Sequence, residues 1–152
     1  MRVGSTTLDF GQGFYTTTLK RQAKYWAWQA SQQSPHLPVS QPAVVSFEVD
    51  RERLAPLDAL WFVRGDYNAD DFWSLIFHCR AGNNHNYSLN SGWYDLVIGP
   101  VTNPYPQRSV MPDYDQISFH TNKAAGVLDA SNRERTVFDS VTGRTLISWG
   151  PL

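Results

Sequence analysis

The chain has 152 residues, 41% of them hydrophobic and 14% aromatic, and its 13 basic and 14 acidic residues give a formal net charge of −1. This length is typical of one domain that can bury its own hydrophobic core, so we expect a single domain over residues 1–152. The balanced charge creates no positive field for a phosphate backbone, which argues against nucleic acid as the principal partner.

The one cysteine and the hydropathy pattern indicate in which cellular compartment the protein resides. Cys79 has no second cysteine with which to form an internal disulfide. The sequence shows neither a charged-then-apolar leader nor an apolar run of membrane length, so we expect a cytoplasmic protein without a membrane partner. Cys79 lies in an amphipathic pattern, which favours a buried structural thiol over a nucleophile.

The first half of the chain predicts two helices and one clear strand. A helix is expected over residues 19–31, capped by the threonines at 16–18, with Ala23, Trp26, Ala27 and Ala30 in one stripe. Prolines predict a loop over residues 32–42. Period-two alternation predicts a strand over residues 43–50, and a short apolar segment follows at 60–63. Its apolar face should carry Ala43, Val45, Phe47 and Val49.

A second helix should be capped by Asn68 and end near Arg80. One face of this helix should carry Phe72, Leu75, Ile76 and Cys79. A polar loop over 81–92 then precedes a short strand over 94–98. Residues 102–112 lack periodicity and predict a long irregular loop of the kind that often forms a lid or binding loop.

The C-terminal part predicts a strand, a short helix and a hairpin. Over residues 115–120, Ile117 and Phe119 should point one way, and Gln116, Ser118 and His120 the other. Thr121 should cap a helix that ends at 128, and residues 136–149 should form a hairpin that turns at 142–143. Strands mixed with few helices predict an α+β fold.

The segment LDFGQGFYTTT at 8–18 is typical of a ligand-binding wall. Gly13 allows close backbone approach to a flat partner, and Tyr15 offers a ring face and a hydroxyl. The same pattern is typical of a tight turn that leads into a core strand, which would make Tyr15 a packed core aromatic. On these residues alone both interpretations stay open.

Several other chemistries lack a matching motif. The four histidines are scattered without the spacing of metal ligands, so we expect no metal site. The glycines at 11 and 13 lack the third glycine and the preceding strand of a dinucleotide fingerprint, and no phosphate-binding loop or serine-hydrolase elbow occurs. Glu48 is a candidate base on a predicted strand, and His120 is predicted to be structural.

Five segments in order make the chain resemble a family of small bacterial proteins with an ADP-ribosyltransferase-like fold, often encoded as the toxin of a toxin–antitoxin pair. They are LDFGQGFYTTT at 8–18, QAKYWA at 22–27, FWSLIFHCR at 72–80, YDLVIGPV at 94–101 and DQISFHTNKA at 115–124. The resemblance implies a split of two small bent antiparallel sheets, a few short helices, and NAD bound as a substrate in the cleft between the sheets.

The resemblance also implies roles for individual residues. Tyr15 would stack on the nicotinamide beside Gly13, and Gln116 would hold the nicotinamide ribose. The same wall would include Thr16, Thr17 and Ser118. The implied reaction displaces nicotinamide and passes ADP-ribose to a cytoplasmic acceptor, and the implied protein partner is an antitoxin. Such a site mainly orients the ribose and stabilises positive charge, a task that suits a carboxylate better than Gln116.

Two departures from the family pattern motivate alternatives. Its first strand, with Tyr-His-Gly, is expected to be missing or shortened here, and Thr102-Asn103-Pro104 stands where an acidic pair is common. A non-catalytic binding protein that keeps the fold and the nucleotide cleft is therefore the second hypothesis. A third, an aromatic-rich carbohydrate or peptide binder, needs exposed tryptophans, whereas the patterns around Trp26 and Trp73 are typical of core residues.

Overall fold

A computed structural model of the chain describes residues 7–32, 41–62, 70–83, 94–103, 108–138 and 145–149. Short strands alternate with four helices in this part of the chain, which confirms the predicted α+β class. The elements are β1 (Phe14–Thr16), α1 (Lys20–Gln32), β2 (Ala43–Glu48), α2 (Arg51–Leu54), β3 (Ala59–Trp61), α3 (Asp70–Arg80), β4 (Leu96–Thr102), β5 (Val110–Phe119), α4 (Asn122–Asp129), β6 (Asn132–Phe138) and β7 (Thr145–Trp149).

The described strands form two small sheets. One has the strand order β1-β5-β4-β3, and the other has the order β2-β6-β7. The pairs are antiparallel except for β3 with β4, which run parallel. Parallel neighbours need a crossover connection, and α3 lies between β3 and β4 in the chain. This one pair departs from the purely antiparallel sheets that the resemblance implied.

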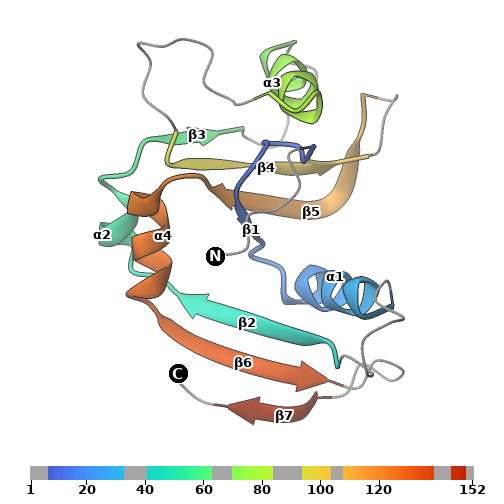
Figure 1. Cartoon of the computed structure of the whole chain (residues 1–152), viewed down its shortest axis with the longest axis vertical. Helices are drawn as coiled ribbons and strands as arrows, with labels where there is room; N and C mark the ends of the chain where they lie inside the picture. Colours follow the sequence, from blue (N-terminus) through green and yellow to red (C-terminus); the bar gives the residue numbers. More distant parts are fainter. Residues whose placement is uncertain are drawn as a thin grey trace.

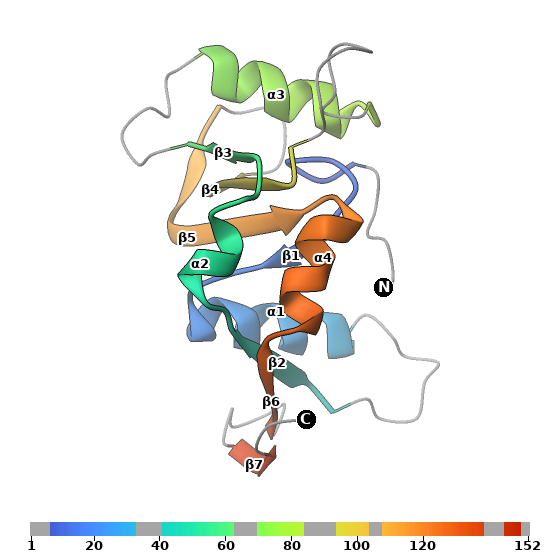
Figure 2. The ribbon, with the colours of Figure 1, turned by 90° about the vertical axis from the view of Figure 1, so that its left-hand side faces the viewer.

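The two sheets lie in separate layers of the molecule. The helix α3 covers one face of the four-stranded sheet, while α1 and the three-stranded sheet lie on its other side (Figure 1). The helices α2 and α4 lie at one edge of the molecule (Figure 1), and a view onto that edge shows them in front, between the two sheets (Figure 2). Among the described residues, none of the helices combines the length and the hydropathy that crossing a membrane requires.

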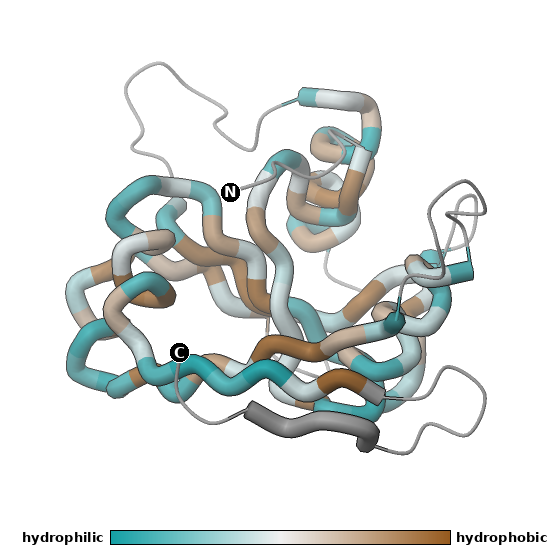
Figure 3. Tube along the Cα trace, turned by 60° about the horizontal axis from the view of Figure 1, so that its bottom comes forward, coloured by the Kyte–Doolittle hydropathy of each residue, from teal (hydrophilic) through white to brown (hydrophobic). Residues whose placement is uncertain are grey.

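Two hydrophobic clusters hold these layers together. The first packs α3 onto the four-stranded sheet through Phe10, Phe72, Trp73, Leu75, Ile76, Cys79 and Val97. The second packs α4 onto the other side through Leu57, Leu96, Phe119, Ala124 and Leu128. The predicted apolar face of α3 is therefore confirmed. The tube of β6 changes from hydrophilic to hydrophobic along its length, so its end is the buried part (Figure 3).

The predicted helices over 19–31, 68–80 and 121–128 are confirmed to within about two residues. The pairing of the terminal hairpin is also confirmed, but its first strand begins at Asn132, four residues before the predicted start. Thr121 caps α4, because its hydroxyl accepts a hydrogen bond from the Ala124 N–H at 3.2 Å. The short helix α2 was not predicted. The predicted Asn68 cap, the turn at 142–143, and most of the loops over 32–42 and 81–92 lie outside the described residues.

Two strand predictions were wrong. The expected loop over 102–112 is strand at both ends, because β4 continues to Thr102 and pairs there with Val110 after a register shift. Such irregularities accommodate prolines within a sheet. In β2, Val44 is buried whereas Val45 is 44% exposed, the reverse of the prediction for these two residues, while Phe47 and the following Val49 pack against the second cluster as predicted. An edge strand with valine on both faces gives no alternation that could decide between them.

Asp95 connects three segments beneath α4. Its carboxylate accepts hydrogen bonds from the Asp58 N–H at 3.0 Å, from the Lys123 ammonium at 3.2 Å and from the Thr121 hydroxyl. Burial by itself raises the pKa of Asp95, but these bonds outweigh it and hold the pKa below its ordinary value. Asp95 therefore joins the start of β3 and the start of α4 to β4.

Gly13 allows β1 to approach the end of β5. A Cβ atom at this position would lie 2.9 Å from both His120 Nδ1 and the Phe119 carbonyl oxygen. We therefore expect Gly13→Ala to lower the free energy of unfolding by about 1–3 kcal/mol, measured by chemical denaturation. Gly126→Ala is the matched control, because no atom lies within 4 Å of its added methyl group inside α4. It should stabilise the protein by about 0.5–1 kcal/mol.

Candidate functional site

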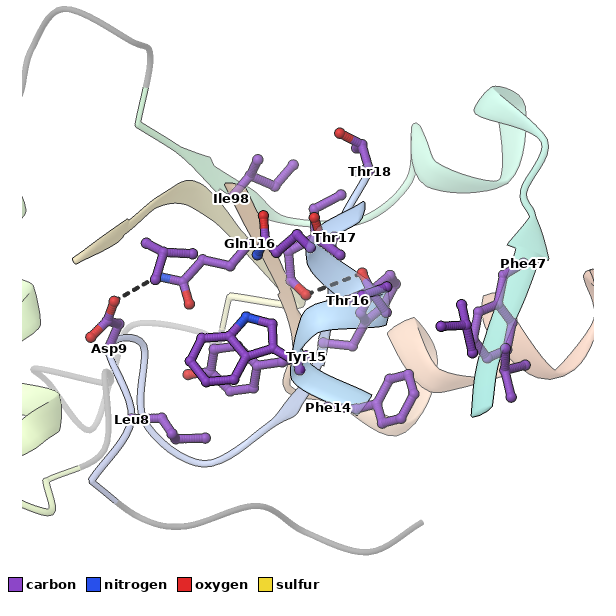
Figure 4. Close-up of a pocket in the computed structure, with 18 of the residues that line it drawn as sticks. Leu8, Asp9, Phe14, Tyr15, Thr16, Thr17, Thr18, Phe47, Ile98 and Gln116 are labelled. Carbon is purple, nitrogen blue, oxygen red and sulfur yellow. Dashed lines mark hydrogen bonds between the residues drawn. The ribbon is translucent and has the colours of Figure 1, made fainter. Parts of the chain in front are cut away.

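A cleft of about 1150 Å³ lies between the two sheets. Its walls come from the segment before β1, from β1 and the first half of α1, from β2, and from the ends of β4 and β5. Polar side chains gather at one end, around Asp9 and Gln116, while Phe47 lies at the other end with Phe14 and Tyr15 between (Figure 4). The cleft thus has a polar end and an apolar end.

The motif at 8–18 supplies a wall of this cleft. Leu8, Asp9 and the five residues from 14 to 18 line it. The turn before β1 depends on Gly11, whose φ of 76° lies in the left-handed region that favours glycine. This motif therefore forms part of the wall of a cleft, as its ligand-binding interpretation requires.

Tyr15 contacts both the core and the cleft. Its ring packs against the first hydrophobic cluster and also lines the cleft. Its hydroxyl donates to the Gly11 carbonyl at 2.8 Å and accepts from the Phe10 N–H at 3.0 Å, and burial raises its pKa above the ordinary value. The hydroxyl is used to close the turn, so what Tyr15 can offer a ligand is its ring.

The threonines predicted to line the wall do so, but their hydroxyl groups bond to β5. The Thr16 hydroxyl donates to the Ile117 carbonyl at 3.3 Å, and the Thr17 hydroxyl donates to the Asp115 carboxylate. Asp115 also accepts from the Thr18 N–H at 3.0 Å. The buried Gln22 side chain bonds to both backbone groups of Asp115. These contacts fix the start of α1 to β5.

A buried polar network forms the polar end of the cleft. The Asp9 carboxylate, 6% exposed, accepts from Arg80 Nε at 2.8 Å, from the Thr102 N–H at 2.9 Å and from the Thr102 hydroxyl at 2.8 Å. Arg80 also donates to the Asn103 carbonyl at 3.1 Å. The sequence-based reasoning missed Asp9, Arg80 and Thr102 as members of the site, because no short-range spacing links them.

Gln116 completes this network from β5. Its side-chain nitrogen Nε2 donates to Asp9 Oδ2 at 2.8 Å and to the Pro100 carbonyl at 2.9 Å. Both N–H bonds of the amide are thereby used. The structure records no donor to the amide oxygen Oε1 among the described residues, and Gln116 lines the cleft. Oε1 is therefore free to accept a hydrogen bond from a ligand.

Ser118, which the resemblance assigned to the wall, does not line the cleft. It is fully buried. Its hydroxyl lies 3.1 Å from the Val97 carbonyl and 2.7 Å from His120 Nε2, and His120 Nδ1 lies 2.8 Å from the Gln12 carbonyl. A carbonyl only accepts, so Nδ1 carries the proton. His120 thus joins β5 to the turn before β1, which fits its predicted structural role.

Trp26 belongs to the cleft and not to the core. Its side chain is 48% exposed and lines the cleft together with Ala23 and Ala27 from the same face of α1. The prediction that Trp26 is a core residue was therefore wrong, whereas Trp73 is 2% exposed and is core. A cleft and a core both select an apolar stripe on a helix, so the spacing alone does not distinguish them.

The remaining candidates lie away from the cleft. Glu48 is exposed and does not line it. Cys79 is fully buried in the first cluster, and burial raises the pKa of its thiol to about 11, so it stays protonated at neutral pH. Among the described residues, no group of three His, Cys, Asp or Glu side chains has an arrangement that could hold a metal ion.

Comparison with protein families gives one match. A model of the family described as "Protein of unknown function (DUF3990)" matches residues 1–111, which include the whole wall at 8–18 as well as Arg80 and Thr102. No curated protein and no solved structure matches the chain.

Arg80→Met tests the buried ion pair of the network. Arg80 and Asp9 have side-chain exposures of 22% and 7%, so removing the guanidinium leaves a buried carboxylate without its charge partner. We expect the free energy of unfolding to fall by about 3 kcal/mol. Arg133→Met is the control, because the Arg133–Asp129 pair is exposed and 3.9 Å long, and it should cost less than about 0.5 kcal/mol. Equal losses in the two variants would contradict this account of the network.

His120 should make stability depend on pH. Burial lowers its pKa below the ordinary value of 6.5, and the bond to the Gln12 carbonyl opposes that shift only in part. As the pH falls through 6.5, the unfolded chain binds a proton before the folded protein does, so the free energy of unfolding decreases. Denaturation curves between pH 7.5 and about 5 should show this loss, and His120→Asn should show a smaller one. An unchanged pH dependence in the variant would exclude His120 as its source.

Proposed function

Since the chain belongs to this family of unknown function, we propose from the residues of the cleft that it is an NAD-dependent ADP-ribosyltransferase. It would displace nicotinamide and transfer ADP-ribose to a target in the cytoplasm. The observation that carries the proposal is the Gln116 amide oxygen, which has no donor among the described residues and lies in a cleft that Tyr15 and Trp26 also line. We further propose that the activity is that of a toxin restrained by an antitoxin protein.

The size of the cleft supports a dinucleotide ligand. Pockets for drug-sized ligands span roughly 300–1000 Å³, and this cleft, at about 1150 Å³, exceeds that range. Lys20 brings positive charge to its wall, which suits a pyrophosphate. The apolar end, with Phe14 and Phe47, suits a flat heterocycle.

The aromatic residues support binding of a cationic ring. The nicotinamide of NAD is a planar cation, and such rings bind the faces of tyrosine and tryptophan by cation–π attraction. The Tyr15 ring is fixed by its two hydroxyl bonds, and the start of the helix that carries Trp26 is bonded to β5. The Tyr15 ring is therefore held in place before a ligand binds, which lowers the entropic cost of binding.

In the proposed reaction the bond between the ribose C1′ and the nicotinamide nitrogen breaks, and its electron pair leaves with neutral nicotinamide. The ribose is left as an oxocarbenium ion. A nucleophilic atom of the acceptor, or water, then bonds to C1′ and loses a proton. Gln116 Oε1 would accept from a ribose hydroxyl, and its dipole would stabilise the positive charge on the sugar. Asp9 neutralises Arg80, so that guanidinium does not oppose this charge.

Arg80 also favours a second candidate function. Because Asp9 is paired with Arg80, the polar end of the cleft has no unpaired carboxylate among the residues described here. A protein that binds NAD without cleaving it would need none. Calorimetry separates the two candidates, since binding of NAD without nicotinamide release supports the binding protein.

The test is to incubate the pure protein with NAD and a cell lysate and to follow nicotinamide release and transfer of labelled ADP-ribose. Gln116→Ala should lower kcat by about 100-fold, because it removes an acceptor used in the transition state. Trp26→Ala should raise KM by up to about 10-fold, the worth of one cation–π contact.

Trp61→Ala is the matched control for Trp26→Ala. Trp61 is 69% exposed and does not line the cleft, so its removal should leave both constants within about twofold of the parent. If the parent protein neither binds NAD nor releases nicotinamide, the proposed function is wrong. If Trp61→Ala changes KM as much as Trp26→Ala does, the assigned role of Trp26 is wrong.

A further inference from the structure

We propose that Asp9 is a positioning residue, which fixes the Gln116 amide so that its oxygen faces the cleft and a ribose hydroxyl. This inference rests on the proposed function for the ligand, but its geometric basis is independent of it. Asp9 precedes β1 and Gln116 lies on β5, and the contact between them spans 107 positions of the chain.

The two partners of the amide dictate its orientation. Gln116 Nε2 donates to Asp9 Oδ2 at 2.8 Å and to the Pro100 carbonyl oxygen at 2.9 Å. A carboxylate and a carbonyl can only accept hydrogen bonds. A flipped amide would lose both bonds and would set its oxygen against two acceptors, so Oε1 is held on the side away from Asp9 and Pro100.

Asp9 in turn is held from three directions. Arg80 Nε donates to it from the end of α3, the Thr102 N–H and hydroxyl donate from the end of β4, and Gln116 donates from β5. With four donors around a carboxylate that is 6% exposed, rotation of the Asp9 side chain would break several charge-assisted bonds. The Asp9 carboxylate therefore has one fixed orientation, and this orientation positions the Gln116 amide.

This arrangement explains why residue 116 is glutamine and not glutamate. A carboxylate at 116 would lie within hydrogen-bond distance of the Asp9 carboxylate and the Pro100 carbonyl, with no donor between them. Like charges at that distance repel each other in a buried site. The amide keeps an acceptor oxygen for the ligand and a donor for Asp9, and only glutamine supplies both at this length of side chain.

The test uses Asp9→Asn with Asp95→Asn as its matched control. Both aspartates are 6% exposed and accept several hydrogen bonds, but Asp95 does not line the cleft. We expect Asp9→Asn to lower kcat for nicotinamide release by about 100-fold, since the side-chain NH₂ of asparagine faces other donors and misplaces the amide. KM should stay within about threefold. Asp95→Asn should leave kcat within about threefold, even at a similar loss of stability.

A spectroscopic readout makes the inference independent of turnover. In ¹⁵N-labelled protein the side-chain NH₂ signals of Gln116 should exchange slowly with solvent, and this protection should be lost in Asp9→Asn and kept in Asp95→Asn. A parent protein that releases no nicotinamide refutes the proposed function, while the NH₂ signals still decide the positioning. An unprotected Gln116 amide in the parent, or one that stays protected in Asp9→Asn, would refute the role of Asp9.

A charge swap covers the case in which Asp9→Asn fails to fold. Gln116→Glu should lose activity and stability because two carboxylates then face each other. In the double variant Asp9→Asn with Gln116→Glu, the asparagine NH₂ can donate to the new carboxylate. We expect the double variant to regain about 10-fold in kcat over Gln116→Glu, the worth of one hydrogen bond to a charged group. No recovery in a folded double variant would overturn the inference.

Discussion

The buried carboxylate of Asp9 is the constraint on which the polar end of the cleft depends. It accepts hydrogen bonds from the last residue of α3, the last residue of β4 and the middle of β5. These segments are distant in sequence, and the hydrophobic clusters alone do not fix their relative positions to hydrogen-bond accuracy. A charge removed from water must be compensated by near-ideal donors, so a small displacement of any of the three segments is costly. The network therefore fixes the relative positions of these segments more tightly than the apolar packing around it does.

The walls of the cleft are attached to the four-stranded sheet by polar anchors of the same kind. Asp115 and Gln22 fix the start of α1 to β5, while Asp95 fixes the start of α4. The apolar parts of both helices then remain available, α4 for the second cluster and α1 for the cleft. Because the anchors hold the helices, Trp26 can stay half-exposed at the cleft without loss of the helix that carries it.

The site could be predicted from sequence in part, and the limits have a physical cause. The motif at 8–18 is local, because Gly11, Gly13 and Tyr15 act through one tight turn, and the prediction of a ligand wall there agrees with the lining of the cleft. Gly13, however, is required by the proximity of His120, which follows the last residue of β5. Trp26 follows a stripe typical of the core, and nothing in its spacing reveals that the opposite wall of the cleft stands away from it.

The sequence by itself determined the class of the fold, the positions of the longer helices, the cap at Thr121 and the turn within residues 8–18, since each depends on neighbours within a few positions. Only the tertiary structure decided the parallel pairing of β3, the exposure of Val45 on β2, and the joining of Asp9, Arg80, Thr102 and Gln116 into one network. Hydrogen bonds and packing between segments of different sheets and helices depend on distances in space, and local patterns of hydropathy and propensity carry no measure of them.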